Sequence, residues 1–218
     1  MMLVFTLFFG KLAKVPSEGV PYPLFSYAAL LPWTLFSESL TRASNSLVND
    51  TNLIQKVYFP RILIPMSSIL SPLVDFAIAF VVLVGLMLYY HYLPTVMLLW
   101  LPAFLLLQLM LALGMGLWLS AINVEFRDVR YAVPFLIQLW LFASPVIYSS
   151  SFVPERFQVA YGIINPMSGI IEGFRWAILG TAPPSYLQLI TSAAIIIVIL
   201  ISGVFYFRRR EMAFADYI

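Results

Sequence analysis

The chain has 218 residues, of which 62% are hydrophobic and 10% are charged, and its formal net charge at pH 7 is +2. Soluble domains carry roughly 25% charged residues, and a soluble fold of this length has too little interior to bury so much apolar surface. The sequence has no cysteine and a single histidine, His91, which excludes disulfides, a thiol nucleophile and a histidine metal cluster. We therefore expect an all-α integral membrane protein.

The first apolar run, residues 1–10, is shorter than the roughly 20 residues that a helix needs to cross a bilayer. It has neither the basic start nor the small-residue cleavage site of a signal peptide. We interpret it as the outer half of a first span whose beginning is missing. Residues 11–23 are polar and rich in proline and glycine, which predicts a loop.

The segment 24–47 is the least hydrophobic of the candidate spans. Glu38 and Arg42 lie four residues apart in it, so they can pair on one helical face. Charges inside a span are costly and usually face protein or a wet cavity. We expect this span to face a pore or a partner, and the pair either lines a pathway or joins two helices.

The connector that follows, residues 48–65, is short and amphipathic. In its part from Asn52 to Pro65, the only charges are those of Lys56 and Arg61, and both are positive. Basic residues in short loops beside spans mark the cytoplasmic side. We therefore place this connector inside the cell.

The connector also carries an apolar helical face, which consists of Leu53, Ile54, Val57 and Tyr58. Pro60 stops the helix and stiffens its exit. We predict a rigid elbow whose apolar face can sink into a groove on a soluble partner. In the alternative, the face rests on the lipid interface while Lys56 and Arg61 reach headgroups.

Two further spans are predicted at 66–90 and 95–122, separated by a break near Pro94. Asp75 lies in the first of them. It is either a proton or cation site, as in ion-coupled carriers, or a carboxylate that caps or pairs near the helix end, and the second interpretation is favoured. In the second of these spans, glycines at 114 and 116 allow close helix contact, either within the chain or between two copies.

A charged turn containing Glu125, Arg127 and Asp128 leads to a span at 131–148. Residues 149–184 are too polar and too rich in glycine and proline to cross cleanly. They contain two apolar pieces, 157–164 and 170–179, which we expect to form short helices in the outer interface. The last span is 186–207, so five full spans follow a partial one.

The distribution of basic residues tests this topology. With the elbow inside, seven basic residues lie in inner segments: Lys56, Arg61, Arg127, Arg130, Arg208, Arg209 and Arg210. Four lie in outer segments: Lys11, Lys14, Arg156 and Arg175. The excess has the sign that the positive-inside rule requires, and it places the C-terminus in the cytoplasm.

Several aromatic residues lie in the spans that carry polar groups. Most aromatic side chains of a membrane protein face lipid or the interface. Those beside polar positions could line a channel, where flat uncharged rings suit the apolar faces of sugars. The candidate channel residues are Trp33, Phe36, Glu38, Arg42, Gln138, Trp140 and Phe142.

The sequence contains no phosphate-binding loop of the G-x-x-x-x-G-K type and no other enzyme motif. The chain is therefore not expected to be an enzyme, and another subunit must supply any energy from ATP. An ion-coupled carrier usually shows two related halves with broken helices, and we find no such repeat.

Three stretches together carry a specific resemblance to a known family: VYFPRILIP, LSAINVEFRDVRYAVPFLIQLWLFASPVIY and INPMSGIIEGFRWAILG. Through them, nearly the whole chain resembles the permease subunit of ABC-type bacterial polysaccharide exporters, which move O-antigen, capsule or teichoic acid. The resemblance implies six spans, a homodimer in the inner membrane, and two separate ATP-binding subunits that hold ATP and magnesium. The leading hypothesis is export of a lipid-linked polysaccharide. The alternatives are a drug or small-lipid exporter of the same fold, an ion-coupled carrier that uses Asp75, and a membrane scaffold that transports nothing.

By the same resemblance, the connector from Leu53 to Arg61 is similar to the coupling helix that docks on the ATP-binding subunit. The turn from Glu125 to Asp128 is similar to the inner loop between the fourth and fifth spans. Residues 152–179 resemble the paired outer helices, and aromatic residues line the family's channels. The family begins with a cytoplasmic amphipathic helix and a complete first span, so the resemblance predicts an N-terminally truncated permease.

Overall fold

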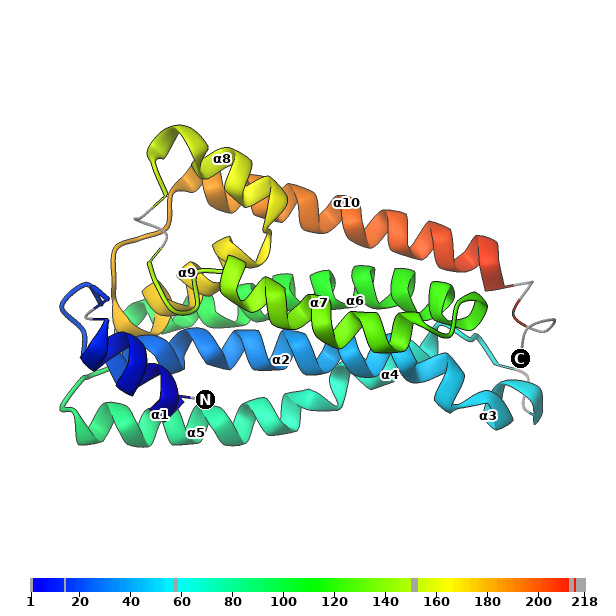
Figure 1. The fold of residues 1–218 in the computed structure, drawn as a ribbon, viewed down its shortest axis with the longest axis horizontal. Coiled ribbons are helices and arrows are strands. Elements are labelled where there is room, and N and C mark those ends of the chain that lie inside the picture. The colour runs from blue at the N-terminus through cyan, green and yellow to red at the C-terminus, as the bar shows by residue number, and fades with distance from the viewer. Residues whose placement is uncertain (1, 14, 57–58, 150–152, 212–213, 215–218) are drawn as a thin grey trace. The chain divides into compact units, whose positions relative to one another are not determined.

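The computed structural model describes residues 2–13, 15–56, 59–149, 153–211 and 214, with the backbone alone at 52, 54, 55, 155 and 156 (Figure 1). Every regular element within these residues is a helix, which confirms the all-α prediction. The chain divides into two compact units. The first contains residues 1–34, 76–108 and 140–195, and the second contains 35–75, 109–139 and 196–218.

The first unit is built from ten helical segments of the described chain, some of which continue into the second unit. They are α1 (Met2–Phe5), the π-helix η1 (Thr6–Leu12), the start of α2 (Tyr22–Asn49), most of α5 (Pro72–Tyr89), the 3₁₀ helix η2 (Val96–Trp100), the start of α6 (Leu101–Glu125), the end of α7 (Val129–Ala143), α8 (Glu155–Ile164), α9 (Met167–Leu179) and the start of α10 (Tyr186–Glu211). The buried face of α2 and nearly all of α9 form its core.

Helix α9 packs closely because small residues line its contacts. A Cβ atom on Gly173 would lie 2.2 Å from the ring of Phe104, and one on Gly169 would lie 2.7 Å from the hydroxyl of Ser192. Gly180 ends α9 in the left-handed conformation, with φ 63°, which glycine adopts without strain. The helix is thereby fixed against α6 and α10 within this unit.

The break between α8 and α9 falls at Asn165–Pro166, as the sequence predicts. Asn165 also serves the end of α7 (Val129–Ala143), because its amide donates to the carbonyl of Ala143 over 3.1 Å. The hydroxyl of Tyr161 donates to the same carbonyl over 2.9 Å. The terminal carbonyls of a helix need such partners. Helix α7 therefore ends five residues before the predicted boundary at 148.

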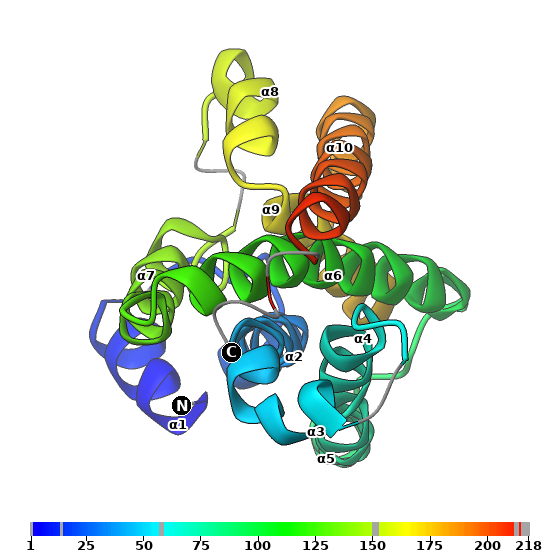
Figure 2. The same cartoon turned by 90° about the vertical axis from the view of Figure 1, so that its right-hand side faces the viewer.

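The second unit contains the rest of α2, α6 and α10, most of α7, the first residues of α5, and two short helices, α3 (Thr51–Lys56) and α4 (Leu63–Leu70). Figure 2 shows α3 following the end of α2 within this unit. Gly114 of α6 lies against the backbone of α10, where an added Cβ would be 2.8 Å from Leu200. In this structure the glycine serves contact within the chain, one of the two alternatives left open for it.

Prolines set the helix boundaries around the connector. Pro65 lies in the first turn of α4, where a missing N–H costs nothing, so the helix begins at Leu63 and the connector is shorter than predicted. Pro72 follows the turn at Ser71 and begins α5. The predicted span at 66–90 is thus two helical pieces that together run from Leu63 to Tyr89.

Three described helical stretches are long and apolar enough to cross a membrane: Leu63–Tyr89, Val96–Glu125 and Tyr186–Glu211. Helix α2 has 28 residues, but its polar second half keeps it outside this set. Helix α7 has 15 residues, fewer than the roughly 20 needed for a simple crossing. The structure supports a multi-helix membrane protein, and the count of five spans and a partial one remains a prediction.

Candidate functional site

The connector in the second unit forms a helical elbow. Helix α3 begins directly after a turn at Asp50, whose backbone carbonyl accepts the N–H of Leu53 over 3.0 Å. The side chain of Leu53 is 45% exposed, and Lys56 is also exposed. The predicted apolar face is only partly visible, because Val57 and Tyr58 lie outside the described residues and only the backbone of Ile54 is described.

The exit of the elbow is packed onto the core of the second unit. Pro60 opens a turn in which its carbonyl accepts the N–H of Leu63 over 3.1 Å. Phe59 and Ile62 pack on an apolar cluster. Its members come from α2, α4, α6 and α10, and from Phe214 after the end of α10: Leu47, Ile64, Leu117, Ala121, Val124, Phe207 and Phe214. The exit of the elbow is therefore in contact with the helices of this unit that form the cluster.

Arg61 ties the elbow to the end of α10. Its backbone N–H donates to the carboxylate of Glu211 over 3.3 Å, and its guanidinium donates to the backbone carbonyl of Glu211 over 2.7 Å. The two residues are 150 positions apart in the chain. Arg61 is thus held within the unit, while Leu53 and Lys56 face outward.

The predicted inner turn lies between α6 and α7. Glu125 pairs with Arg210 of α10 at 3.2 Å, and the Arg210 guanidinium also lies 5.7 Å from the ring centre of Tyr206. Arg127 and Asp128 are exposed. One member of the predicted turn therefore anchors α6 to α10, and two are available on the surface.

The charged pair predicted in α2 includes a third member. Arg42 lies 3.5 Å from Glu38 and 3.6 Å from Asp75, and it donates a hydrogen bond of 3.0 Å to Ser71. Asp75 lies in the first turn of α5, where the helix dipole stabilises a carboxylate. The preferred interpretation, in which Asp75 pairs near the end of its helix, agrees with this geometry.

The predicted channel residues differ in exposure. In the first unit, Trp33 is buried and packs edge-on against Trp140, with ring centres 6.2 Å apart, and the Trp140 indole donates to Asn165 over 3.0 Å. Phe142 in that unit is exposed. In the second unit, Phe36 is wholly buried and Gln138 is exposed. Trp33 and Phe36 thus present no open surface in this structure, and a role in a channel stays a prediction for all four aromatic residues.

Sequence reasoning missed the role of Arg175, which it counted as a charge of an outer segment. The side chain is wholly buried on α9 in the first unit. Its guanidinium donates to the carbonyl of Val146 over 2.7 Å and to that of Tyr148 over 2.9 Å, and it lies 3.7 Å from the ring centre of Phe25. Arg175 thereby joins α9, the turn after α7 and the start of α2.

Glu172 supplies the counter-charge for this arginine, at 3.3 Å and one helical turn away. Burial lowers the pKa of Arg175, while Glu172 and then Glu18 act in the opposite direction. Arginine stays protonated in proteins, so the pair is ionic. The signal that could have revealed it is Glu-x-x-Arg within the apolar piece 170–179, since buried charges need partners.

A sequence model of the ABC-2 type transporter family matches residues 1–179, which include the elbow, the Arg42 cluster and α9. The chain belongs to the ABC-2 type transporter family. It is 31% identical over 216 residues to an O-antigen export system permease protein, RfbA, of Myxococcus xanthus, covering 97% of this chain and 82% of that protein. It is 27% identical over 199 residues to a protein of the same name from Klebsiella pneumoniae, covering 89% and 75%.

Membership of the ABC-2 family agrees with the long apolar helices and makes this chain a membrane-embedded transporter subunit. The family match ends at Leu179, the last residue of α9, so the buried Arg175 lies within the matched part. The elbow lies there as well. The Arg175 contacts therefore lie within the matched part, while the elbow packs on residues beyond it, among them Phe207 and Glu211.

Proposed function

We propose that the chain is the permease subunit of an ATP-driven exporter that moves a lipid-linked polysaccharide across the bacterial inner membrane. The observation that carries the proposal is the alignment of nearly the whole chain with permeases named for O-antigen export. The long apolar helices supply the membrane-embedded part that such a permease needs.

The energy comes from a separate ATP-binding subunit, which binds ATP and magnesium, because this sequence has no phosphate-binding loop. Helix α3 is the docking element, since Leu53 offers apolar surface to a groove on that subunit. Leu53, Ile54, Lys56, Val57 and Tyr58 make the contact. Arg61 and the packed residues Phe59 and Ile62 then transmit the movement to α10 and α6.

The permease acts as a homodimer, with its C-terminus in the cytoplasm. Aromatic side chains of the two copies line the path of the sugar chain, as the resemblance to polysaccharide exporters implies. Exposed Phe142 and partly exposed Trp140 supply such rings in each copy, and buried Trp33 packs edge-on against Trp140. Rings without charge favour the apolar faces of sugars over ions.

Two alternatives remain within transport. A drug or small-lipid exporter of the same fold would use the same elbow and differ in its cargo. An ion-coupled carrier would need Asp75 free to bind and release a proton or cation, and the ion pair with Arg42 counts against this. Binding a proton or cation at this carboxylate would require breaking its contact with the Arg42 guanidinium.

Reconstitution of the permease with its ATP-binding subunit tests the proposal. Proteoliposomes should move a lipid-linked glycan to the opposite leaflet, measured as access of the glycan to an added glycosidase, only when ATP is present. A subunit whose ATP-binding site is inactivated is the control. Transport of a hydrophobic dye without the glycan would favour the drug-exporter alternative, and glycan movement driven by an ion gradient without ATP would contradict the proposal.

A further inference from the structure

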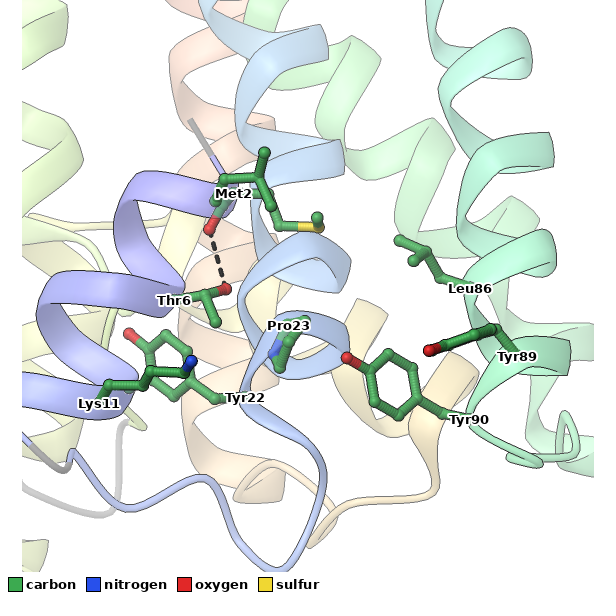
Figure 3. A pocket seen from close by; sticks show the side chains of 10 residues that line it. Met2, Thr6, Lys11, Tyr22, Pro23, Leu86, Tyr89 and Tyr90 are labelled. Atoms are coloured by element: carbon green, nitrogen blue, oxygen red, sulfur yellow. Dashed lines mark hydrogen bonds between the residues drawn. The ribbon is translucent and has the colours of Figure 1, made fainter.

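A cavity of about 510 Å³ lies within the first unit, beside the end of α5. Its walls come from the α1–η1 segment, the start of α2 and the end of α5 (Figure 3). Tyr89 is the last residue of a helix that is long and apolar enough to span a membrane. A membrane crossed by this helix would place the cavity level with its interface, where tyrosine rings are typically found.

The lining is apolar apart from one charge. Leu3 and Leu86 contribute aliphatic surface from two facing elements, and Tyr89 and Tyr90 contribute rings that meet edge to face, with centres 5.2 Å apart. Lys11 carries the single charge of the lining, because no acidic residue is among the described residues that form it. This combination selects a ligand with an apolar body and an anionic head.

The walls hold their position through local contacts. Gly10 of η1 lies so close to Tyr22 that an added Cβ would approach its ring within 2.8 Å. The hydroxyl of Tyr22 donates to the carbonyl of Ile147 over 3.0 Å, which leaves its ring as a wall of the cavity. The hydroxyl of Thr6 donates to the carbonyl of Met2 over 2.9 Å, so it is already satisfied (Figure 3). Lys11 is thus the cationic group that selects the ligand, next to the hydroxyls of Tyr89 and Tyr90.

We propose that this cavity binds an anionic glycerophospholipid from the leaflet at the Tyr89 end of the span. The lipid phosphate lies at Lys11, whose apolar stem follows the wall while its ammonium reaches the headgroup. One acyl chain lies along Leu3 and Leu86. The volume suits part of a single lipid, since ligand cavities of about 300–1,000 Å³ hold small molecules and not polymers. The site concerns the surrounding membrane and does not depend on which cargo is exported.

Photocrosslinking in lipid nanodiscs tests the site. The permease carries a photoreactive benzophenone amino acid at Leu86, in discs of phosphatidylcholine with a minor fraction of phosphatidylglycerol. After illumination, mass spectrometry compares the two lipid adducts. Phosphatidylglycerol should be enriched over its share of the disc. Lys11→Gln should reduce the enrichment about fivefold, the effect of one cationic side chain at an anionic lipid surface.

Lys11→Arg should keep the enrichment, and Arg130→Gln, which removes an exposed cation of the second unit, should leave it unchanged. Each comparison uses protein that remains folded in the disc. Adducts in the same ratio as the bulk lipids would overturn the proposal. So would a crosslink to a protein segment in place of lipid, or an enrichment that is equal in wild type and Lys11→Gln.

Discussion

Arg175 is the largest fully buried side chain of the described residues, and it is charged. Moving a guanidinium out of water costs several kcal/mol, so it is retained only where several acceptors replace the lost water. Here the carbonyls of Val146 and Tyr148, the carboxylate of Glu172 and the face of Phe25 do so. Lysine could not replace it, because a single ammonium lacks the planar fork that reaches separate carbonyls.

We predict that Arg175→Met lowers the free energy of unfolding by about 3–5 kcal/mol, because it leaves Glu172 buried without its counter-charge. The control is Arg210→Met, whose pair with Glu125 is partly exposed and should contribute about 0–1 kcal/mol. Denaturant unfolding in detergent measures both. Equal losses in the two variants would show that Arg175 does not hold the first unit together.

The carboxylate of Asp75 also has a charged partner, the guanidinium of Arg42. In the exporter mechanism it stabilises the junction of α2 and α5 within the second unit through Arg42, and it binds no transported ion. We predict that Asp75→Asn keeps ATP-driven export, with a stability loss of about 1 kcal/mol or less because the pair is exposed. Glycan translocation and ATP hydrolysis are measured together. Loss of translocation with normal assembly and intact hydrolysis would revive the ion-coupled alternative.

At the scale of the element, the elbow has an outward-facing part and a part that is packed on the core of its unit. Helix α3 offers Leu53 outward, and the residues after Pro60 are packed inward on the apolar cluster of the second unit. In the proposed mechanism, docking and transmission therefore depend on different residues, and substitutions should separate them.

Leu53→Asp should weaken binding of the ATP-binding subunit at least tenfold, because an unpaired charge in a dry interface costs more than the 1.4 kcal/mol that corresponds to that factor. Co-purification of the two subunits measures this. Asn49→Asp, at an exposed position near the end of α2, adds the same charge without removing an apolar contact and should bind normally. Undiminished, coupled ATPase in Leu53→Asp would place the docking surface elsewhere.

Arg61→Ala should behave differently. It removes the 2.7 Å bond to the Glu211 carbonyl and leaves the outward face of α3 intact. We expect the ATP-binding subunit to remain bound and to hydrolyse ATP, while glycan transport per ATP falls severalfold. Arg127→Ala, which removes an exposed arginine of the neighbouring turn, is the matched control. Transport that falls equally in both variants would argue against a specific tie through Arg61.

At the scale of the whole molecule, the charges predict the orientation in the membrane. Seven basic residues lie in the segments assigned to the cytoplasm. Of the four assigned outside, Arg175 is buried in protein and carries no information on orientation, so three remain. Leaving Arg175 out increases the predicted excess of basic residues on the cytoplasmic side. The positive-inside rule concerns charges in loops, which must stay out of the membrane.

Reporter fusions after Arg210 and at Lys56 should therefore both show cytoplasmic activity, and a fusion at Glu155 should show external activity. Alkaline phosphatase and green fluorescent protein give opposite signals at each site and serve as controls for each other. An external signal at Lys56 would reverse the orientation and remove the docking role of α3.

The sequence by itself determined what depends on neighbours along the chain. The excess of apolar residues predicts membrane helices. Pro60 and Asn165–Pro166 predict helix ends, and in the structure α3 is Thr51–Lys56 and α8 ends at Ile164. The Glu38–Arg42 pair follows from helical spacing alone. The predicted end of α7 was less accurate. The hydrogen bonds at its last residue, Ala143, come from residues that lie beyond the helix in the chain.

Only the tertiary structure decided how the remaining charges are used. Arg61 meets Glu211, Glu125 meets Arg210, and Arg175 is surrounded by carbonyls of α2 and of the turn after α7. Composition and periodicity describe a residue together with its neighbours within a few turns. A contact between residues 150 positions apart leaves no trace in either, because it depends on which helices pack together. For that reason Arg175, which the sequence places in an outer segment, is buried in the structure and joins three segments of the first unit.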